Sequence, residues 1–140
     1  VIAKRELKNA IEALEPAALF NVIVFSSDVS YWLDGGVSDS KTASREEAKE
    51  FIDRLGAGGG TNIFGALRAA FDDPDVDTIY FLSDGEPSTG DVIDPGEIRE
   101  RVRLWNEHRG GKIHTVSVGG TFDILDWLAE DSGGESVRFP

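Results

Sequence analysis

The apolar run from Ile79 to Leu82, which ends in Ser83-Asp84-Gly85, constrains the fold of this chain more than any other segment. Its residues do not alternate between apolar and polar, so we expect a strand that helices cover on both faces, as in parallel sheets. Open α/β sheets build their ligand sites where such strands end. Asp84, which follows the run, is therefore a candidate site residue.

A second candidate lies in the glycine-rich stretch before this strand, where Gly58-Gly59-Gly60 leads into Thr61-Asn62. Taken alone, Thr61 would be a helix N-cap and Asp84-Gly85 an ordinary turn. Together, on neighbouring loops, a hydroxyl and a carboxylate favour a metal site instead. Oxygen ligands suit a hard cation, so we expect Mg²⁺, or else Mn²⁺ or Ca²⁺, rather than zinc. Asn62 is expected to start a helix rather than to bind the ion.

Helical and extended patterns alternate along the chain, which indicates an α/β fold with a mostly parallel sheet. A capping box at Ser44–Glu47 and Asp94-Pro95 are predicted helix starts, and residues 34–42 and 84–93 are predicted loops. Residues 1–140 make one domain, because a chain of this length buries a single core. The predicted helices cover residues 3–15, 44–55, 61–73, 122–130 and a stretch from 94 onward, and the predicted strands cover 20–26, 29–33, 76–82, 112–118 and 136–139.

Composition excludes several classes of function. The formal net charge of −12 argues against nucleic acid, and no apolar stretch is long enough to span a membrane. The chain has no cysteine, so disulfides and thiol chemistry are excluded. His108 and His114 lack the spacing of a zinc pair, no nucleophile elbow is present, and the glycine-rich stretch does not have the spacing of a nucleotide-binding loop.

Other conspicuous side chains have structural interpretations. The three tryptophans are expected to pack in the core or at its edge. Glu86 and Asp91 are expected to be solvated surface residues, and Asp94 is expected to cap the helix that follows it.

Two motifs connect the candidate residues with a known family. Thr61 within Gly-Gly-Gly-Thr-Asn and Asp84 within Phe-Leu-Ser-Asp-Gly-Glu-Pro resemble the second and third elements of the metal-ion-dependent adhesion site of von Willebrand factor A domains. Residues 20–26, 113–119 and 128–134 are also similar to that family, so the resemblance covers the whole chain. The family's first element, Asp-x-Ser-x-Ser after the first strand, is absent from this sequence.

The resemblance implies a Rossmann-like three-layer sandwich with strand order 3-2-1-4-5-6 and an antiparallel edge strand. Residues 20–26, 29–33 and 76–82 would be strands two, three and four, followed by strands five and six. Strand one, in the centre of the sheet, is then missing, and we expect an N-terminally truncated domain. Because that strand carries most of the family's ligands, only Thr61 and Asp84 remain, and weak metal binding is expected.

The resemblance also implies a protein–protein interaction module of the adhesion type, in which an acidic side chain of a protein partner completes the coordination shell of a divalent cation. One alternative is a metal-dependent hydrolase or phosphoryl-transfer domain that uses Asp84, and another is a scaffold that binds no metal. The sequence supplies no convincing general base or nucleophile, so we do not expect an enzyme. Without strand one, strands two and four would each expose an edge, which favours self-association.

Overall fold

The structure is a computed structural model, and it describes residues 2–13, 19–21, 23–25, 29–32, 38–39, 42–54, 61–83, 86–118, 120 and 122–139. The described helices are α1 (Ile2–Glu12), α2 (Thr42–Asp53), α3 (Ile63–Asp72), α4 (Pro95–Asn106) and α5 (Asp123–Ser132). The described strands are β1 (Leu19–Phe20), β2 (Ile23–Phe25), β3 (Val29–Tyr31), β4 (Ser38–Asp39), β5 (Thr78–Ser83), β6 (Lys112–Val118) and β7 (Ser136–Phe139).

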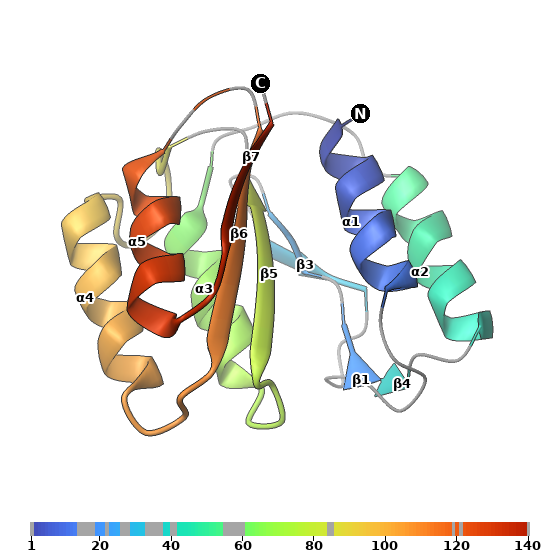
Figure 1. Cartoon of the computed structure of the whole chain (residues 1–140), viewed down its shortest axis with the longest axis horizontal. Coiled ribbons are helices and arrows are strands. Elements are labelled where there is room, and N and C mark those ends of the chain that lie inside the picture. The colour runs from blue at the N-terminus through green and yellow to red at the C-terminus, as the bar shows by residue number, and fades with distance from the viewer. Residues whose placement is uncertain are drawn as a thin grey trace.

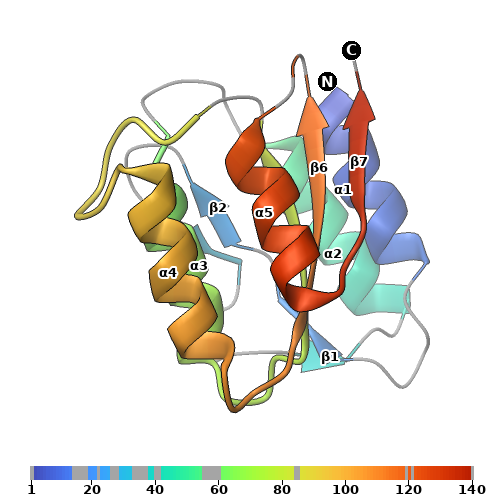
Figure 2. The same ribbon diagram turned by 60° about the vertical axis from the view of Figure 1, so that its left-hand side comes forward.

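The central layer is a parallel sheet with the strand order β5-β6-β7. Thr78 of β5 lies opposite Lys112 of β6, and Thr115 of β6 lies opposite Ser136 of β7. Helices α3, α4 and α5 lie on one side of this sheet, and α1 and α2 lie on the other (Figure 1 and Figure 2). The predicted α/β fold with three layers is therefore confirmed.

The amino-terminal strands are shorter and more divided than we predicted. β2 pairs with β3 in an antiparallel manner, as expected for strands two and three, but β1 pairs separately with β4. The predicted single strand over residues 20–26 is thus wrong, and Asn21, a residue type that strands disfavour, lies between its two parts. β4 also lies within residues 34–42, which we predicted to be a loop.

Helix α4 begins as predicted, and helix α2 does not. The side chain of Asp94 accepts a hydrogen bond from the amide of Glu97 at 2.9 Å, and Pro95 occupies the first turn, where its missing N–H costs nothing. Helix α2 begins at Thr42, so Ser44 lies inside it and the predicted capping box is wrong. Ala43 lies between Thr42 and Ser44, and alanine has the highest helix propensity, which favours a helix start before the serine.

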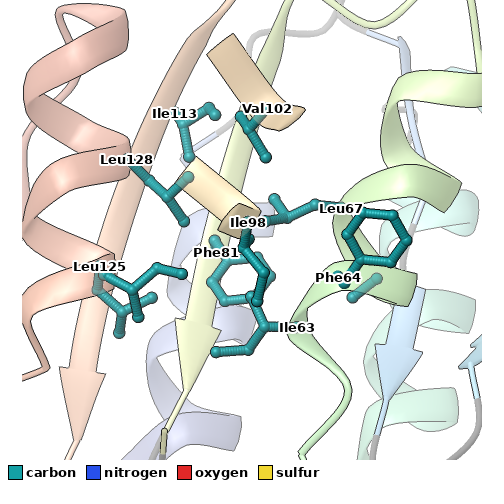
Figure 3. Packing of buried hydrophobic residues seen from close by; sticks show 11 residues of the cluster. Ile63, Phe64, Leu67, Phe81, Ile98, Val102, Ile113, Leu125 and Leu128 are labelled. Carbon is teal, nitrogen blue, oxygen red and sulfur yellow. The ribbon is translucent and has the colours of Figure 1, made fainter. Parts of the chain in front are cut away.

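The main hydrophobic core lies between the sheet and the helices α3, α4 and α5. Figure 3 shows Phe81 of β5 among Ile63 of α3, Ile98 of α4 and Leu125 of α5. Each of these side chains is at most 5% exposed. The burial of apolar side chains such as these is the dominant favourable contribution to folding. The core therefore fixes the sheet and these helices relative to one another.

A second, separate cluster lies between α1, α2 and β1, and is formed by Ile11, Phe20, Ala48 and Ile52. The sheet face on that side is only partly covered. Tyr80 of β5 is 52% exposed and Val137 of β7 is 43% exposed, although α1 contacts β5. Our expectation that helices cover β5 on both faces therefore holds for the Phe81 face and fails at Tyr80.

In the part of the chain that the structure describes, no hydrogen-bonded ladder joins β2 to β5. β5 forms a ladder with β6, and β2 forms one with β3. Among the described ladders, each of these strands thus lies at an edge of its sheet. That a central strand is missing stays a prediction. Among the described helices, none has the length and apolar character needed to cross a membrane.

Candidate binding site at the carboxyl end of β5

Thr61 lies immediately before α3, and its neighbour Asn62 forms the N-cap of that helix. Oδ1 of Asn62 accepts a hydrogen bond from the amide of Gly65 at 2.8 Å. The prediction of Thr61 as the N-cap is therefore wrong, and the prediction that Asn62 starts the helix is confirmed. Asparagine caps helices at least as well as threonine, which explains why Asn62 rather than Thr61 is the N-cap of α3. The hydroxyl of Thr61 is consequently not the group that caps α3.

Asp84 and Gly85 lie outside the described residues, so the assignment of Asp84 as a metal ligand stays a prediction. The structure does place the end of β5, at the buried Ser83, and the loop that resumes at Glu86.

The loop after β5 lies directly against Thr61. The amides of Ser88 and Thr89 both donate to the carbonyl of Thr61, at 2.9 and 3.2 Å. The amide of Thr61 in turn donates to Oγ of Ser88 at 2.8 Å. The two loops predicted to carry the site are therefore hydrogen-bonded to each other, although they are far apart in the sequence.

Two further contacts join the same loops. Gly90 has a positive φ of 107°, which residues with a side chain rarely adopt. A Cβ at this position would overlap the side-chain oxygen of Asn62. One residue on, Asp91 forms an ion pair with Arg68 of α3 at 3.5 Å, and both side chains are largely exposed, so this pair contributes little. Ser88 and Gly90 were not singled out in the sequence, because neither residue type indicates a distant partner.

The charged residues around the loop agree with the structural interpretations made from the sequence. Glu86 and Asp91 are exposed, and Asp94 caps α4. The histidines are not paired with each other: His108 lies in the turn after α4, while His114 stacks on Tyr80 and accepts a hydrogen bond from the amide of Glu135 at 3.0 Å.

The tryptophans pack against other aromatic or cationic side chains, as predicted. Trp105 lies against Phe64 and Phe71, Trp127 lies under Arg99, and Trp32 stacks on Phe20. No tryptophan is needed to explain the candidate site.

Two carboxylates on α5, Asp126 and Asp131, have a shifted pKa. A hydrogen bond from the Ser136 hydroxyl, followed by the ion pair with Arg138, holds the pKa of Asp126 below its ordinary value. A bidentate pair of hydrogen bonds from Arg99 likewise lowers the pKa of Asp131. These ion pairs join α5 to β7 and α4 and have a structural role.

The described residues provide only part of the ligands that a divalent cation needs. Among these residues, there is no group of three or more His, Asp or Glu side chains that could hold a metal. Divalent cations such as Mg²⁺ and Ca²⁺ take six or more oxygen ligands, so the hydroxyl of Thr61 fits only as one member of a larger set. The described residues alone do not form a complete metal site.

A parallel sheet between two helical layers, with two loops joined beyond the carboxyl end of β5, defines a Rossmann-like domain of the kind that binds ligands at this edge. Within that class, the chain belongs to the von Willebrand factor type A domain family, whose model matches residues 2–137.

Two human relatives illustrate the similarity. The chain is 31% identical to von Willebrand factor A domain-containing protein 3A over 119 residues, covering 82% of this chain and 10% of that protein. It is 30% identical to inter-alpha-trypsin inhibitor heavy chain H4 over 151 residues, covering 96% of this chain and 16% of that protein. The chain therefore spans only a small part of the length of these relatives.

Solved structures show the same fold. A von Willebrand factor type A protein from Catenulispora acidiphila matches 99% of this chain and 33% of its own, with a TM-score of 0.84 at 22% identity. Proximal thread matrix protein 1 from the mussel byssus matches 96% of this chain and 35% of its own, with a TM-score of 0.69 at 19% identity. At these identities the likeness establishes the fold and nothing finer.

Proposed function

We propose that this chain is a protein-binding module whose partner docks at the carboxyl end of β5, with Thr61 and Asp84 as oxygen ligands of a divalent cation. The observation that carries the proposal is the hydrogen bonding between Thr61 and the loop after β5. It brings together the two segments that the sequence marks as ligand-bearing. Membership of the von Willebrand factor type A family supports the same assignment.

The chemistry of these two side chains suits a cation that is shared with a partner. A neutral hydroxyl and few carboxylates neutralise only part of the charge of a bound ion. The remaining positive charge favours coordination of a carboxylate from the partner. Mg²⁺ is the ion that fits such ligands best, with Mn²⁺ or Ca²⁺ as substitutes. The remaining protein ligands would come from an Asp-x-Ser-x-Ser segment, which this sequence does not contain.

We also propose that the module is not an enzyme. The sequence has no nucleophile elbow and no cysteine, and His114 is held by stacking and by the amide of Glu135. The relatives named above are much longer than this chain, so their partners are not assigned to it.

The proposal can be tested with Mn²⁺ alone as the probe, because a paramagnetic ion broadens nearby amide signals even when it binds weakly. In the intact protein, Mn²⁺ should broaden the signals of Thr61 and Ser88, and Asp84→Asn should remove that effect. Asp91→Asn is the matched control, since Asp91 is an exposed carboxylate on the same loop. Broadening that survives Asp84→Asn but not Asp91→Asn would show that the ligand assignment is wrong.

Two other outcomes correspond to the alternatives. If Mn²⁺ broadens no signal near Thr61 in the intact protein, the chain is a scaffold that works without metal. If the intact protein hydrolyses phosphoesters and Asp84→Asn abolishes turnover, the binding-module proposal fails in favour of an enzyme.

A further inference from the structure

The main chain of Thr61 is held from both sides by one short segment, Ser88–Thr89. The carbonyl of Thr61 accepts from both amides of that segment, and its own amide donates to Oγ of Ser88. These hydrogen bonds hold the two peptide units that flank the Cα of Thr61, so they also fix the direction of its Cα–Cβ bond. Oγ of Ser88 is the only side-chain atom in this set of three hydrogen bonds.

Asn62, the next residue, is enclosed by two glycines. A Cβ on Gly65 would lie 2.6 Å from Nδ2 of Asn62, and a Cβ on Gly90 would overlap its Oδ1. Gly65 belongs to α3 and Gly90 to the loop after β5, so the Asn62 side chain lies between the helix and the loop. A side chain at position 90 would have to displace either the loop or the cap of α3.

We propose that Ser88 and Gly90 are positioning residues for Thr61, and we call their contacts with Thr61 and Asn62 the Thr61 clamp. Ser88 fixes the main chain of Thr61, and Gly90 allows the loop to approach the cap of α3. The clamp holds the two loops of the site as one preformed unit. Its consequence for ion binding rests on the proposed function, whereas the clamp itself does not.

Outside the clamp, Ser88 has little structural importance. Its side chain is exposed, and the main core lies deeper, between the sheet and the helices. Removal of the Ser88 hydroxyl should therefore loosen Thr61 without unfolding the domain. Because the order of Thr61 can change without a change in the stability of the domain, the positioning role of Ser88 can be measured.

The first experiment measures amide hydrogen exchange in the intact protein. Ser88→Ala removes the acceptor of the Thr61 amide, so exchange at Thr61 should become at least about tenfold faster, while amides of β6 keep their rates. Ser88→Thr retains a hydroxyl and should restore slow exchange. Thr78→Ala is the control for loss of a hydroxyl at the other end of β5 and should leave Thr61 unchanged.

The second experiment measures Mn²⁺ broadening of the Thr61 signal in the same variants. Ser88→Ala and Gly90→Ala should each require roughly 10- to 100-fold more Mn²⁺, the usual cost of removing a residue that orients a ligand. Ser88→Thr should behave like the original protein.

The possible outcomes separate the two proposals. Unchanged exchange at Thr61 in Ser88→Ala would overturn the clamp. Faster exchange with no Mn²⁺ broadening in the original protein would leave the clamp in place and overturn the proposed cation site. Faster exchange with unchanged Mn²⁺ sensitivity in both Ser88→Ala and Gly90→Ala would show that the clamp exists but does not position the ligand, which overturns the positioning role.

Discussion

At the scale of single residues, the assignment of two neighbours decides what the site can do. Asn62 caps α3 and is enclosed by Gly65 and Gly90, while Thr61 is fixed through its main chain. A threonine used as a helix cap would have its hydroxyl oxygen committed to an amide of the first turn. Because Asn62 performs that role, the cap of α3 does not require the Thr61 hydroxyl, which under the proposed function is an ion ligand.

The roles of the two residues can be separated by their effect on stability. Asn62→Ala should lower the free energy of unfolding by about 1 kcal/mol, because α3 loses its cap. Thr61→Ala should change it by less than about 0.5 kcal/mol, as a surface substitution outside such features does. Urea unfolding monitored by circular dichroism gives both values, and Asn62→Asp should keep the cap. A larger loss in Thr61→Ala than in Asn62→Ala would contradict this assignment.

At the scale of elements, the sequence predicted best where one local signal was strong. Asp94 and Pro95 identified the start of α4, and the apolar run at residues 79–82 identified β5. It predicted worst where local signals competed, as at Ser44, which lies inside α2. The Thr61 clamp could not be predicted, because it depends on hydrogen bonds between segments that only the fold brings together.

Helix α5 is the element whose stability should depend most visibly on acid. The folded-state pKa of Asp126 is held below the ordinary value of 3.8, chiefly by the Ser136 hydroxyl and then by Arg138, and that of Asp131 by Arg99. A lowered pKa means that the unfolded chain binds the proton more readily. The stabilisation is therefore complete well above pH 3.8 and is lost as the pH falls through the folded-state values.

This dependence can be measured by comparing urea unfolding at pH 5 and pH 3. Asp126→Asn should lose less stability than the original protein over this interval, because its contribution no longer titrates. Asp91→Asn is a control, since Asp91 is an exposed carboxylate in a weak ion pair. Identical losses in the original protein and in Asp126→Asn would rule out a stabilising role for this carboxylate.

At the scale of the whole molecule, the strands that the structure describes form three separate sheets rather than one continuous sheet. No ladder among the described residues joins β2 to β5, and the two hydrophobic clusters share no residue. Edges of this kind pair readily with other chains, and a divided core lowers the cooperativity of folding.

We therefore expect the isolated 140-residue chain to self-associate at micromolar concentrations or to have a low thermal unfolding temperature. Sedimentation velocity over a range of concentrations measures the first and calorimetry the second. Addition of an upstream segment that carries Asp-x-Ser-x-Ser should reduce association and raise the unfolding temperature. A monomeric chain with one sharp transition at an ordinary temperature would show that its parts close together without a further strand.

The separation of the two clusters has a spectroscopic consequence. Trp32 stacks on Phe20 beside the smaller cluster, whereas Trp105 and Trp127 pack against the larger one. Each half of the molecule thus carries its own fluorophore. Replacing Trp32 by phenylalanine leaves tryptophan emission from the α3–α5 side alone. Replacing the other two tryptophans leaves tryptophan emission from the α1–α2 side, so each half can be followed optically without an attached dye.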